Sequence, residues 1–249
     1  MRLSSMKKYF FLFVLLSACT SGSPEKQDKL HIEMLNVGQG LAFLIKGKNC
    51  NSLYDTGTPS SGIDTMLQNR GIKNLCSVII SHRHNDHAGG LPRLEEMAKN
   101  GEIRIKRVIF GDSLSRGDTI ADFLPWTARI LFQEGAMRIS DSKNSFLFMA
   151  DLEKEHEKRI LELDPLLTAT ALQIGHHGSK TSSSWEFLAQ VQPKIALISV
   201  GRYNTYGHPH PETLAKLRLV LPDSTQLFRT DLDGNIVVEW VYGVGMWRW

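Results

Sequence analysis

The chain has 249 residues, enough for one large domain or two small ones with a well-buried core. Hydrophobic residues make up 42% and charged residues 22% of it, and it carries three cysteines, which together exclude a disordered tail, a collagen-like fibre, a coiled-coil rod and a disulfide scaffold. Three of the 29 basic residues lie within residues 1–18, and the other 26 match the 26 acidic residues, so the charge gives no support to nucleic-acid binding.

The N-terminal segment predicts export. Arg2, Lys7 and Lys8 precede a short apolar run, Tyr9–Leu16, and small residues follow that run, as in a secretory signal. The run is too short to span a bilayer as a permanent helix. We therefore expect a signal peptide over residues 1–18.

The next residue predicts attachment to a membrane. Leu16-Ser17-Ala18-Cys19 resembles the bacterial lipobox, in which the cysteine becomes the lipidated N-terminus. Residues 19–29 are polar and predict a tether. We expect the body to be lipid-anchored through Cys19 in the cell envelope, outside the cytoplasm, on the periplasmic or extracellular face. The alternative is an ordinary signal peptide with an incidental cysteine.

Apolar patterns predict mixed strands and helices in the body. Strands are expected over residues 30–37, 41–46, 52–55, 75–80, 106–110, 136–140, 145–150, 172–174, 195–200, 226–229 and 235–240. Helices are expected over 63–70, after 90 as far as 100, and over 151–163, 184–191 and 212–219. Residues 111–134 have no clear pattern. Because no Pro/Gly/Ser-rich linker interrupts the series, residues 30–249 are expected to form a single domain.

One segment contains residues that are typical metal ligands. The run Ser81-His82-Arg83-His84-Asn85-Asp86-His87 follows the apolar strand that ends at Ile80. Imidazole and carboxylate are ligands suited to zinc, manganese or iron. Alternate residues of an extended segment face the same side, so His82 and His84 can bind one ion, while Asp86 and His87 can reach a second. The alternative is a histidine-rich surface loop.

This pattern resembles a known superfamily. His-x-His-x-Asp-His followed by Gly-Gly is similar to the first motif of the metallo-β-lactamase superfamily. Leu53-Tyr54-Asp55-Thr56-Gly57 is similar to its early Asp-Thr-Gly strand end, Asp151 lies where its metal-bridging aspartate is expected, and His176-His177-Gly178-Ser179 lies where a late metal histidine is expected. The resemblance implies an α/β (α+β) fold, the four-layer αββα sandwich, with a metal-dependent hydrolase site at one edge.

Further motifs resemble one branch of that superfamily. Residues 36–40, 199–204, 206–209 and 229–234, together with the His-His-Gly-Ser run, are similar to the extracellular hydrolase domain of ComEC-type competence proteins, here free-standing. Two positions depart from the branch, because Leu41 stands where Asp is usual after Gly-Gln-Gly, and Ala150 stands where Gly usually precedes the bridging Asp. DNA uptake is not carried over.

The ligands are divided between two divalent ions, zinc or manganese. We assign His82, His84 and His176 to the first ion, assign Asp86, His87 and His177 to the second, and let Asp151 bridge them. Two adjacent histidines can both face the site because Gly175 and Gly178 favour a loop. The alternative is a single ion bound by some of these residues, with the other histidine of the pair contacting a metal ligand rather than the metal.

Paired ions imply hydrolysis by hydroxide. They lower the pKa of a bridging water, polarise the scissile group and stabilise the leaving oxygen, so no serine or cysteine nucleophile is required. Asp86 and Asp151 are the residues predicted to be catalytic, and Asp86 can also orient the water.

Four other residues are expected near the site. Asp55 either orients a ligand histidine or caps a turn. Asn204 and His208 either donate to the substrate phosphate or leaving group, or serve a rigid Gly/Pro loop. Asp231 either lies behind the ligands or caps a turn. Among the cysteines, Cys76 is interpreted as a buried core thiol.

The favoured function is a dinuclear phosphodiesterase at the cell envelope, with DNA as one substrate through the ComEC resemblance. The neutral body and the lack of an evident aromatic and basic platform argue against DNA. The alternatives are hydrolysis of a cell-envelope phosphodiester, hydrolysis of a β-lactam, and a non-catalytic envelope binding protein that keeps the fold.

Overall fold

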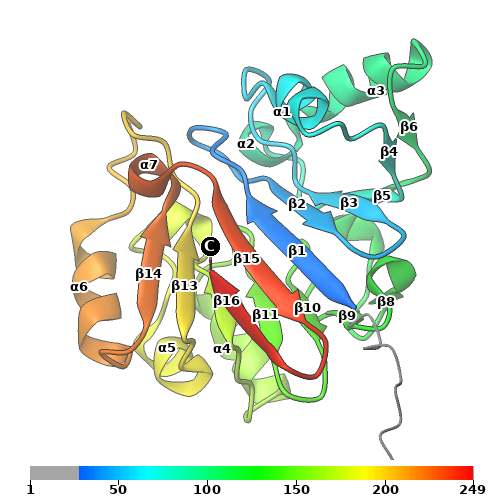
Figure 1. Cartoon of the computed structure of the whole chain (residues 1–249). Coiled ribbons are helices and arrows are strands. Elements are labelled where there is room, and N and C mark those ends of the chain that lie inside the picture. Colours follow the sequence, from blue (N-terminus) through cyan, green and yellow to red (C-terminus); the bar gives the residue numbers. More distant parts are fainter. Residues whose placement is uncertain (1–27, 249) are drawn as a thin grey trace, which may run out of the picture.

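The computed structural model describes residues 28–248. The predicted signal peptide, Cys19 and most of the tether lie outside the described residues. Two seven-stranded sheets form the centre of the molecule (Figure 1). None of the helices within residues 28–248 has the length and apolar character needed to cross a membrane.

The first sheet has the order β16-β15-β1-β2-β3-β5-β7. Its strands are β1 (Lys29–Met34), β2 (Phe43–Lys46), β3 (Asn51–Tyr54), β5 (Ser77–Ile80), β7 (Val108–Phe110), β15 (Ile236–Val241) and β16 (Gly245–Arg248). Strands β3, β5 and β7 are parallel to one another, and the other neighbours are antiparallel. A separate parallel pair joins β4 (Asn74–Leu75) to β6 (Arg104–Ile105).

The second sheet has the order β14-β13-β12-β11-β10-β9-β8. Its strands are β8 (Thr119–Ile120), β9 (Thr127–Ile130), β10 (Met137–Ser140), β11 (Ser145–Phe148), β12 (Ala171–Gln173), β13 (Ile195–Ile198) and β14 (Gln226–Arg229). The four strands from β11 to β14 are parallel. Each sheet therefore has a parallel half, and loops at the carboxyl ends of parallel strands are where α/β folds place ligands.

Helices cover the outer face of each sheet (Figure 1). The α-helices of the described residues are α1 (Ile63–Asn69), α2 (Asn85–Ala88), α3 (Leu91–Lys99), α4 (Lys154–Leu163), α5 (Trp185–Val191), α6 (Pro211–Val220) and α7 (Thr230–Asp233). Buried residues of α1 and α3 pack on the first sheet, and those of α4, α5 and α6 pack on the second. The predicted αββα sandwich is confirmed.

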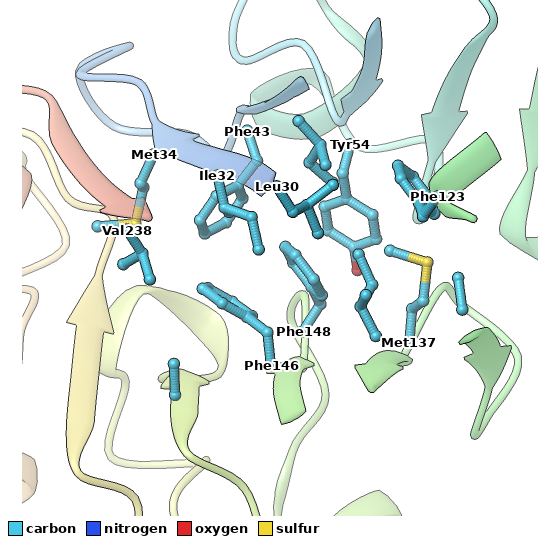
Figure 2. Packing of buried hydrophobic residues seen from close by; sticks show 14 of the residues in the cluster. Leu30, Ile32, Met34, Phe43, Tyr54, Phe123, Met137, Phe146, Phe148 and Val238 are labelled. Atoms are coloured by element: carbon cyan, nitrogen blue, oxygen red, sulfur yellow. The ribbon is translucent and has the colours of Figure 1, made fainter. Parts of the chain in front are cut away.

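The main core lies between the sheets (Figure 2). Phe43 of the first sheet packs edge-on against Phe146 and Phe148 of the second, with ring centroids 5.8 and 5.0 Å apart. Each fully buried side chain of this size stabilises the fold by about 1.5–3 kcal/mol. This core fixes the two sheets relative to one another, and therefore fixes the loops at their shared edge.

Several elements differ from the sequence predictions. The strand expected over 75–80 is two strands, because Leu75 pairs with Ile105 whereas β5 pairs with β3 and β7. The helix expected from Asp151 begins at Lys154, because Glu153 and His156 form a capping box that starts it there. The strands over 226–229 and 236–241 lie in different sheets, with α7 between them.

The interpretation of Cys76 as a buried core thiol is wrong. Cys50 and Cys76 form a disulfide, and both side chains are half-buried. They immediately precede β3 and β5, which are neighbouring parallel strands, so their Cα atoms lie 5.8 Å apart. The pairing depends on a contact between residues 26 positions apart, which spacing alone does not reveal.

Candidate metal centre

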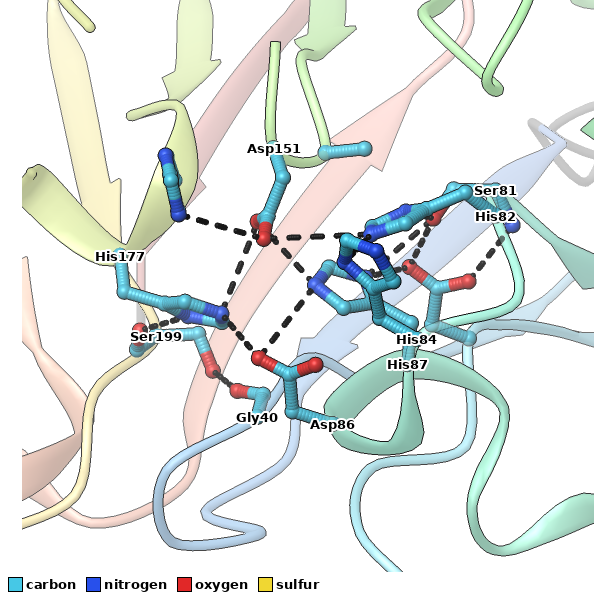
Figure 3. Close-up of polar contacts among 12 residues, drawn as sticks. Gly40, Ser81, His82, His84, Asp86, His87, Asp151, His177 and Ser199 are labelled. Carbon is cyan, nitrogen blue, oxygen red and sulfur yellow. Dashed lines mark hydrogen bonds and ion pairs between the residues drawn. The ribbon is translucent and has the colours of Figure 1, made fainter. Parts of the chain in front are cut away.

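The predicted ligands converge at one edge, between the two sheets (Figure 3). The loop after β5 carries His82, His84, Asp86 and His87, Asp151 follows β11, and His176-His177 follow β12. Since β5 belongs to the first sheet and the other two strands to the second, both halves of the sandwich contribute. The structure brings all seven side chains together, and their role as ligands stays a prediction.

Asp151 lies between two groups of candidate donors. One group comprises Asp86, His87, His177 and Asp151, and the other comprises His82, His84 and Asp151, with the donor atoms of each group within 4.8 Å of one another. This division matches the predicted assignment for every residue except His176, which is outside both groups. His176 Nε2 nevertheless lies 3.7 Å from Asp151 Oδ2.

The two oxygens of Asp151 face different groups. Oδ1 lies 3.1 Å from His87 Nε2 and 3.5 Å from His177 Nε2. Oδ2 lies 4.0 Å from His82 Nε2 and faces His176. A carboxylate placed in this way can bind one ion with each oxygen.

The other ring nitrogen, Nδ1, is anchored in three of these histidines. His87 Nδ1 lies 2.7 Å from Asp55 Oδ2, His177 Nδ1 donates to the Ser199 carbonyl at 2.8 Å, and His176 Nδ1 lies 3.3 Å from Glu153 Oε1. A proton held on Nδ1 leaves Nε2 with its lone pair directed at Asp151. The protein thus fixes both the orientation and the tautomer of each ring.

Asp55 has the strongest of these anchoring positions. It is fully buried, and its carboxylate also accepts hydrogen bonds from the Ser81 amide and hydroxyl, each at 2.7 Å. These contacts satisfy the carboxylate of Asp55 without the turn cap that was the alternative expectation. Its contacts support the prediction that it orients a histidine.

Asp55→Asn should weaken metal binding by about 10–100-fold, which is the usual effect of removing such an anchor. The amide can donate toward His87 Nδ1, which would reverse the tautomer and turn the lone pair of Nε2 away. Titration of the metal-free variant against a competing chelator measures this affinity. Asp64→Asn, on α1, is the matched control and should leave the affinity unchanged. An unchanged affinity in Asp55→Asn would contradict the assignment.

The backbone beside the ligands is strained. Asp55, Ala150, His176 and His177 all have positive φ, from 48° to 58°. This left-handed conformation costs a non-glycine residue about 1–2 kcal/mol. It turns both histidines of the 3-10 turn His176–Gly178 away from strand alternation, as predicted from the flanking glycines. Strain of this kind persists where surrounding structure enforces it.

Gln173 is the residue that holds this strained backbone. Its buried amide oxygen accepts from Met149 N at 2.7 Å and from Ala150 N at 2.8 Å. Its amide nitrogen donates to the carbonyls of Ala150 and Ile174. Sequence analysis missed this residue, although a glutamine in an otherwise apolar strand was a visible signal.

A glycine brings a third loop against the site. A Cβ on Gly40 would lie 2.6 Å from the Asp86 carbonyl oxygen, so only glycine fits there. Leu41 N donates to the same carbonyl at 2.9 Å, and Ser199 Oγ donates to the Gly40 carbonyl at 2.7 Å. These contacts position Asp86 and explain the Asn36–Gly40 motif.

The donor set fits divalent cations. His87 Nε2 and Asp151 Oδ1 are buried and face one another without a hydrogen-bond partner among the described residues. Burial raises the pKa of Asp151, but the close contact with His87 Nε2 at 3.1 Å and the charges of the surrounding histidines outweigh it and lower that pKa far below its usual range. Burial lowers the pKa of His87, but Asp55 and Asp151 raise it to about 10. The carboxylates of Asp55, Asp86 and Asp151 surround His87, so the site supplies anionic oxygens that favour a cation, and a cation bound at His87 Nε2 would replace the proton held there.

The remaining predicted residues occupy different positions. Asn204 donates to the carbonyls of Gly201 and His208 and accepts from His208 N, so its side chain has no donor left for a substrate. These contacts favour the alternative in which Asn204 serves a rigid Gly/Pro loop. Asp231 pairs with Arg229, and within residues 28–248 no hydrogen bond or ion pair joins it to the histidines.

His208 does lie beside the site. Its ring centroid is 5.9 Å from that of His176, and its Nδ1 is buried without a partner in the described chain. A pocket of about 210 Å³ adjoins the other side of His176, lined by His82, His84, Glu134, Asp151, Leu152, Glu153, His156 and His176. Both features leave room next to the donors for a substrate.

Comparison with known proteins identifies the chain. Residues 35–130 match the family model described as the metallo-beta-lactamase superfamily. Recombination protein 2 of Haemophilus influenzae is 35% identical over 75% of this chain and 26% of its own length. ComE operon protein 3 of Bacillus subtilis is 28% identical over 95% of this chain and 35% of its own. This chain is a metallo-β-lactamase-fold protein related to the ComEC-type competence proteins. It spans between a quarter and about a third of the length of these relatives.

Solved structures agree on the metallo-β-lactamase fold. The metallo-beta-lactamase fold protein YhfI from Bacillus subtilis superposes with a TM-score of 0.60 over 86% of this chain and 100% of its own, at 13% identity. A diphosphatase from the PhnP family superposes with a TM-score of 0.51 over 86% of this chain and 99% of its own, at 14% identity. At such identities the likeness concerns the fold alone.

Proposed function

We propose that this metallo-β-lactamase-fold protein is a phosphodiesterase that uses two divalent ions, zinc or manganese. The observation that carries the proposal is Asp151, whose two oxygens face two separate groups of nitrogen and oxygen donors. His82, His84 and His176 would hold the first ion, Asp86, His87 and His177 the second, and Asp151 both.

The bound ions would activate water and polarise the scissile group. The residues of the chain have the other tasks. Asp55, Ser199 and Glu153 keep the histidine rings directed at Asp151. Asp86, one-third exposed and 3.3 Å from His177 Nε2, is placed to accept a proton from an attacking water. Its pKa is lowered: burial raises it, but the hydrogen bond with His177 and the neighbouring histidines outweigh that effect, so Asp86 is ionised at neutral pH.

The residues around the bridging aspartate favour a phosphodiester over a β-lactam. Asp151 follows Ala150, and His177 of one donor group belongs to a His-His-Gly-Ser loop, features that resemble the phosphodiesterase branches. The names of the relatives, recombination and competence proteins, make DNA one candidate substrate. A phosphodiester of the cell envelope is the other candidate.

A screen of the purified mature protein tests the reaction. We expect about two bound ions per chain, hydrolysis of bis-p-nitrophenyl phosphate, and loss of that activity with a chelator. Nucleic acids, glycerophosphodiesters and β-lactams are assayed in parallel. Hydrolysis of β-lactams alone would overturn the proposal, and bound metal without hydrolysis of any substrate would favour a binding protein.

The proposed location is the outer side of a membrane, with lipid on Cys19. The Cys50–Cys76 disulfide supports export, since structural disulfides persist in oxidising compartments. Cys19→Ser should release the protein from the membrane fraction or block its processing, as judged by fractionation and gel mobility. Ser23→Ala is the control, because it changes the predicted tether without touching the lipobox or the Cys50–Cys76 disulfide. An unchanged distribution of Cys19→Ser would contradict the anchor.

A further inference from the structure

Two tyrosines beside the candidate metal centre are turned to solvent. Tyr203 is 89% exposed and Tyr206 is 71% exposed, among the most exposed large side chains of the described residues. Both lie in the segment Gly201–His208, which follows β13. From the sequence, Asn204 and His208 of this segment were expected either to contact the substrate or to serve a rigid Gly/Pro loop, and no aromatic platform was predicted.

The loop that carries them is rigid. The three hydrogen bonds of Asn204 tie Gly201 to His208 across the loop. Gly201 N donates to Gln39 Oε1 at 3.1 Å, and His210 N donates to the Gly178 carbonyl at 2.9 Å. A group held this firmly loses little conformational freedom when it binds a ligand.

Successive rings connect the loop to the metal centre. The ring centroids of His176 and His208 are 5.9 Å apart. The ring of Tyr206 lies nearly parallel to that of His208, with an interplanar angle of 16° and centroids 5.9 Å apart. A flat group stacked on Tyr206 would thus be separated from His176, a candidate metal ligand, by the rings of Tyr206 and His208.

The loop also carries positive charge. The Arg202 guanidinium lies 6.0 Å from the centroid of the Tyr203 ring, in the range of a cation–π contact. Exposed aromatic rings with an adjacent arginine form the platforms on which single-stranded nucleic acids stack their bases. Such platforms tolerate any base, because every base has an aromatic face.

We infer that Tyr206, with Tyr203 and Arg202, forms a stacking subsite for the nucleobase next to the scissile phosphodiester. The inference rests on the proposed function and names its substrate class as nucleotide phosphodiesters. It also answers the objection that the body is neutral, because stacking supplies affinity that does not depend on net charge.

Two esters with the same leaving group isolate the base. Thymidine 5′-(p-nitrophenyl phosphate) and ethyl p-nitrophenyl phosphate both release p-nitrophenol, and only the first carries a nucleobase. In Tyr206→Leu, the ratio of kcat/KM for the thymidine ester to kcat/KM for the ethyl ester should fall by about 5- to 150-fold. Tyr206→Phe keeps the ring and should keep the ratio.

A second measurement needs no metal or turnover. Binding of a fluorescein-labelled oligothymidylate to the metal-free protein, followed by anisotropy, should weaken in Tyr206→Leu. Tyr242→Leu is the matched control, since Tyr242 lies beside the turn at Asp141, at the opposite end of β11 from Asp151. It should bind the oligonucleotide as the wild type does.

The outcomes separate the two proposals. If the wild type hydrolyses both esters and Tyr206→Leu leaves their ratio and the oligonucleotide affinity unchanged, the stacking subsite is wrong and the phosphodiesterase stands. If Tyr206→Leu lowers both rates equally, the residue acts on the site rather than on the base, which also overturns the inference. If the wild type hydrolyses neither ester, the proposed function fails, and unaltered oligonucleotide binding in Tyr206→Leu would overturn the subsite as well.

Discussion

Asp151→Ala should abolish hydrolysis and remove most of the bound metal. The variant takes from both donor groups the one residue they share. Stabilisation of transition-state charge by bound ions contributes several kcal/mol, so kcat should fall by at least about a thousandfold even at saturating metal. Metal analysis and initial rates on bis-p-nitrophenyl phosphate, measured on the same sample, check both effects.

The control for this variant is Asp223→Ala. Asp223 is exposed after α6 and lies in neither donor group, so its variant should keep its metal and its rate. Circular dichroism should show that Asp151→Ala remains folded, because the main core between the sheets does not include its side chain. A folded Asp151→Ala variant with substantial activity would exclude the two-ion mechanism.

His176→Ala and His177→Ala should each reduce bound metal from two ions toward one. His177 belongs to the buried group with Asp86 and His87, whereas His176 faces Asp151 Oδ2 on the side of His82. Each variant should therefore lose a different ion. Activity should fall steeply in both, since neither ion alone completes the site.

Comparing the two variants decides between two ions and one. If only one of the histidines binds metal, the variant of its neighbour should keep full metal content and lose activity by about 10–100-fold, as changes behind a ligand do. His31→Ala is the control for loss of a histidine and should keep both ions, because His31 lies on β1 and contacts Glu33 and Glu239 rather than the donor groups. Full metal content in both His176→Ala and His177→Ala would contradict the assignment.

Local spacing predicted most of the candidate site. The segment from His82 to His87 follows a strand that ends at Ile80; period-2 alternation predicted that His82 and His84 share a side, and Asp86 and His87 lie in the short helix α2 that follows. The placement of Asp151 and of the pair His176-His177 came from the ends of two further apolar strands. The carboxyl ends of parallel strands meet at one edge, so strand ends that are distant in sequence become neighbours.

Contacts between distant segments were beyond the sequence. Ser199 anchors a ring nitrogen of His177 through its backbone carbonyl, and Glu153 anchors one of His176 from a loop. In the sequence, neither residue differs from an ordinary polar residue without such a contact. The partition of β14 and β15 between two sheets depends on pairing with β13 and β1. The Cys50–Cys76 disulfide likewise follows from the adjacency of β3 and β5.

The donors come from both sheets, and this ties assembly of the centre to the whole chain. The loop 82–87 is synthesised well before Asp151 and the His176-His177 turn, so an N-terminal fragment holds only part of either group. An ion bound between the sheets would also hold the two halves together. At a free metal concentration 100 times the dissociation constant, one such ion stabilises the native state by about 2.7 kcal/mol. A shortage of metal would thus lower the stability of the protein as well as its activity. A degraded chain that lacks either half of the sandwich would lack a complete donor group and could not act on a substrate.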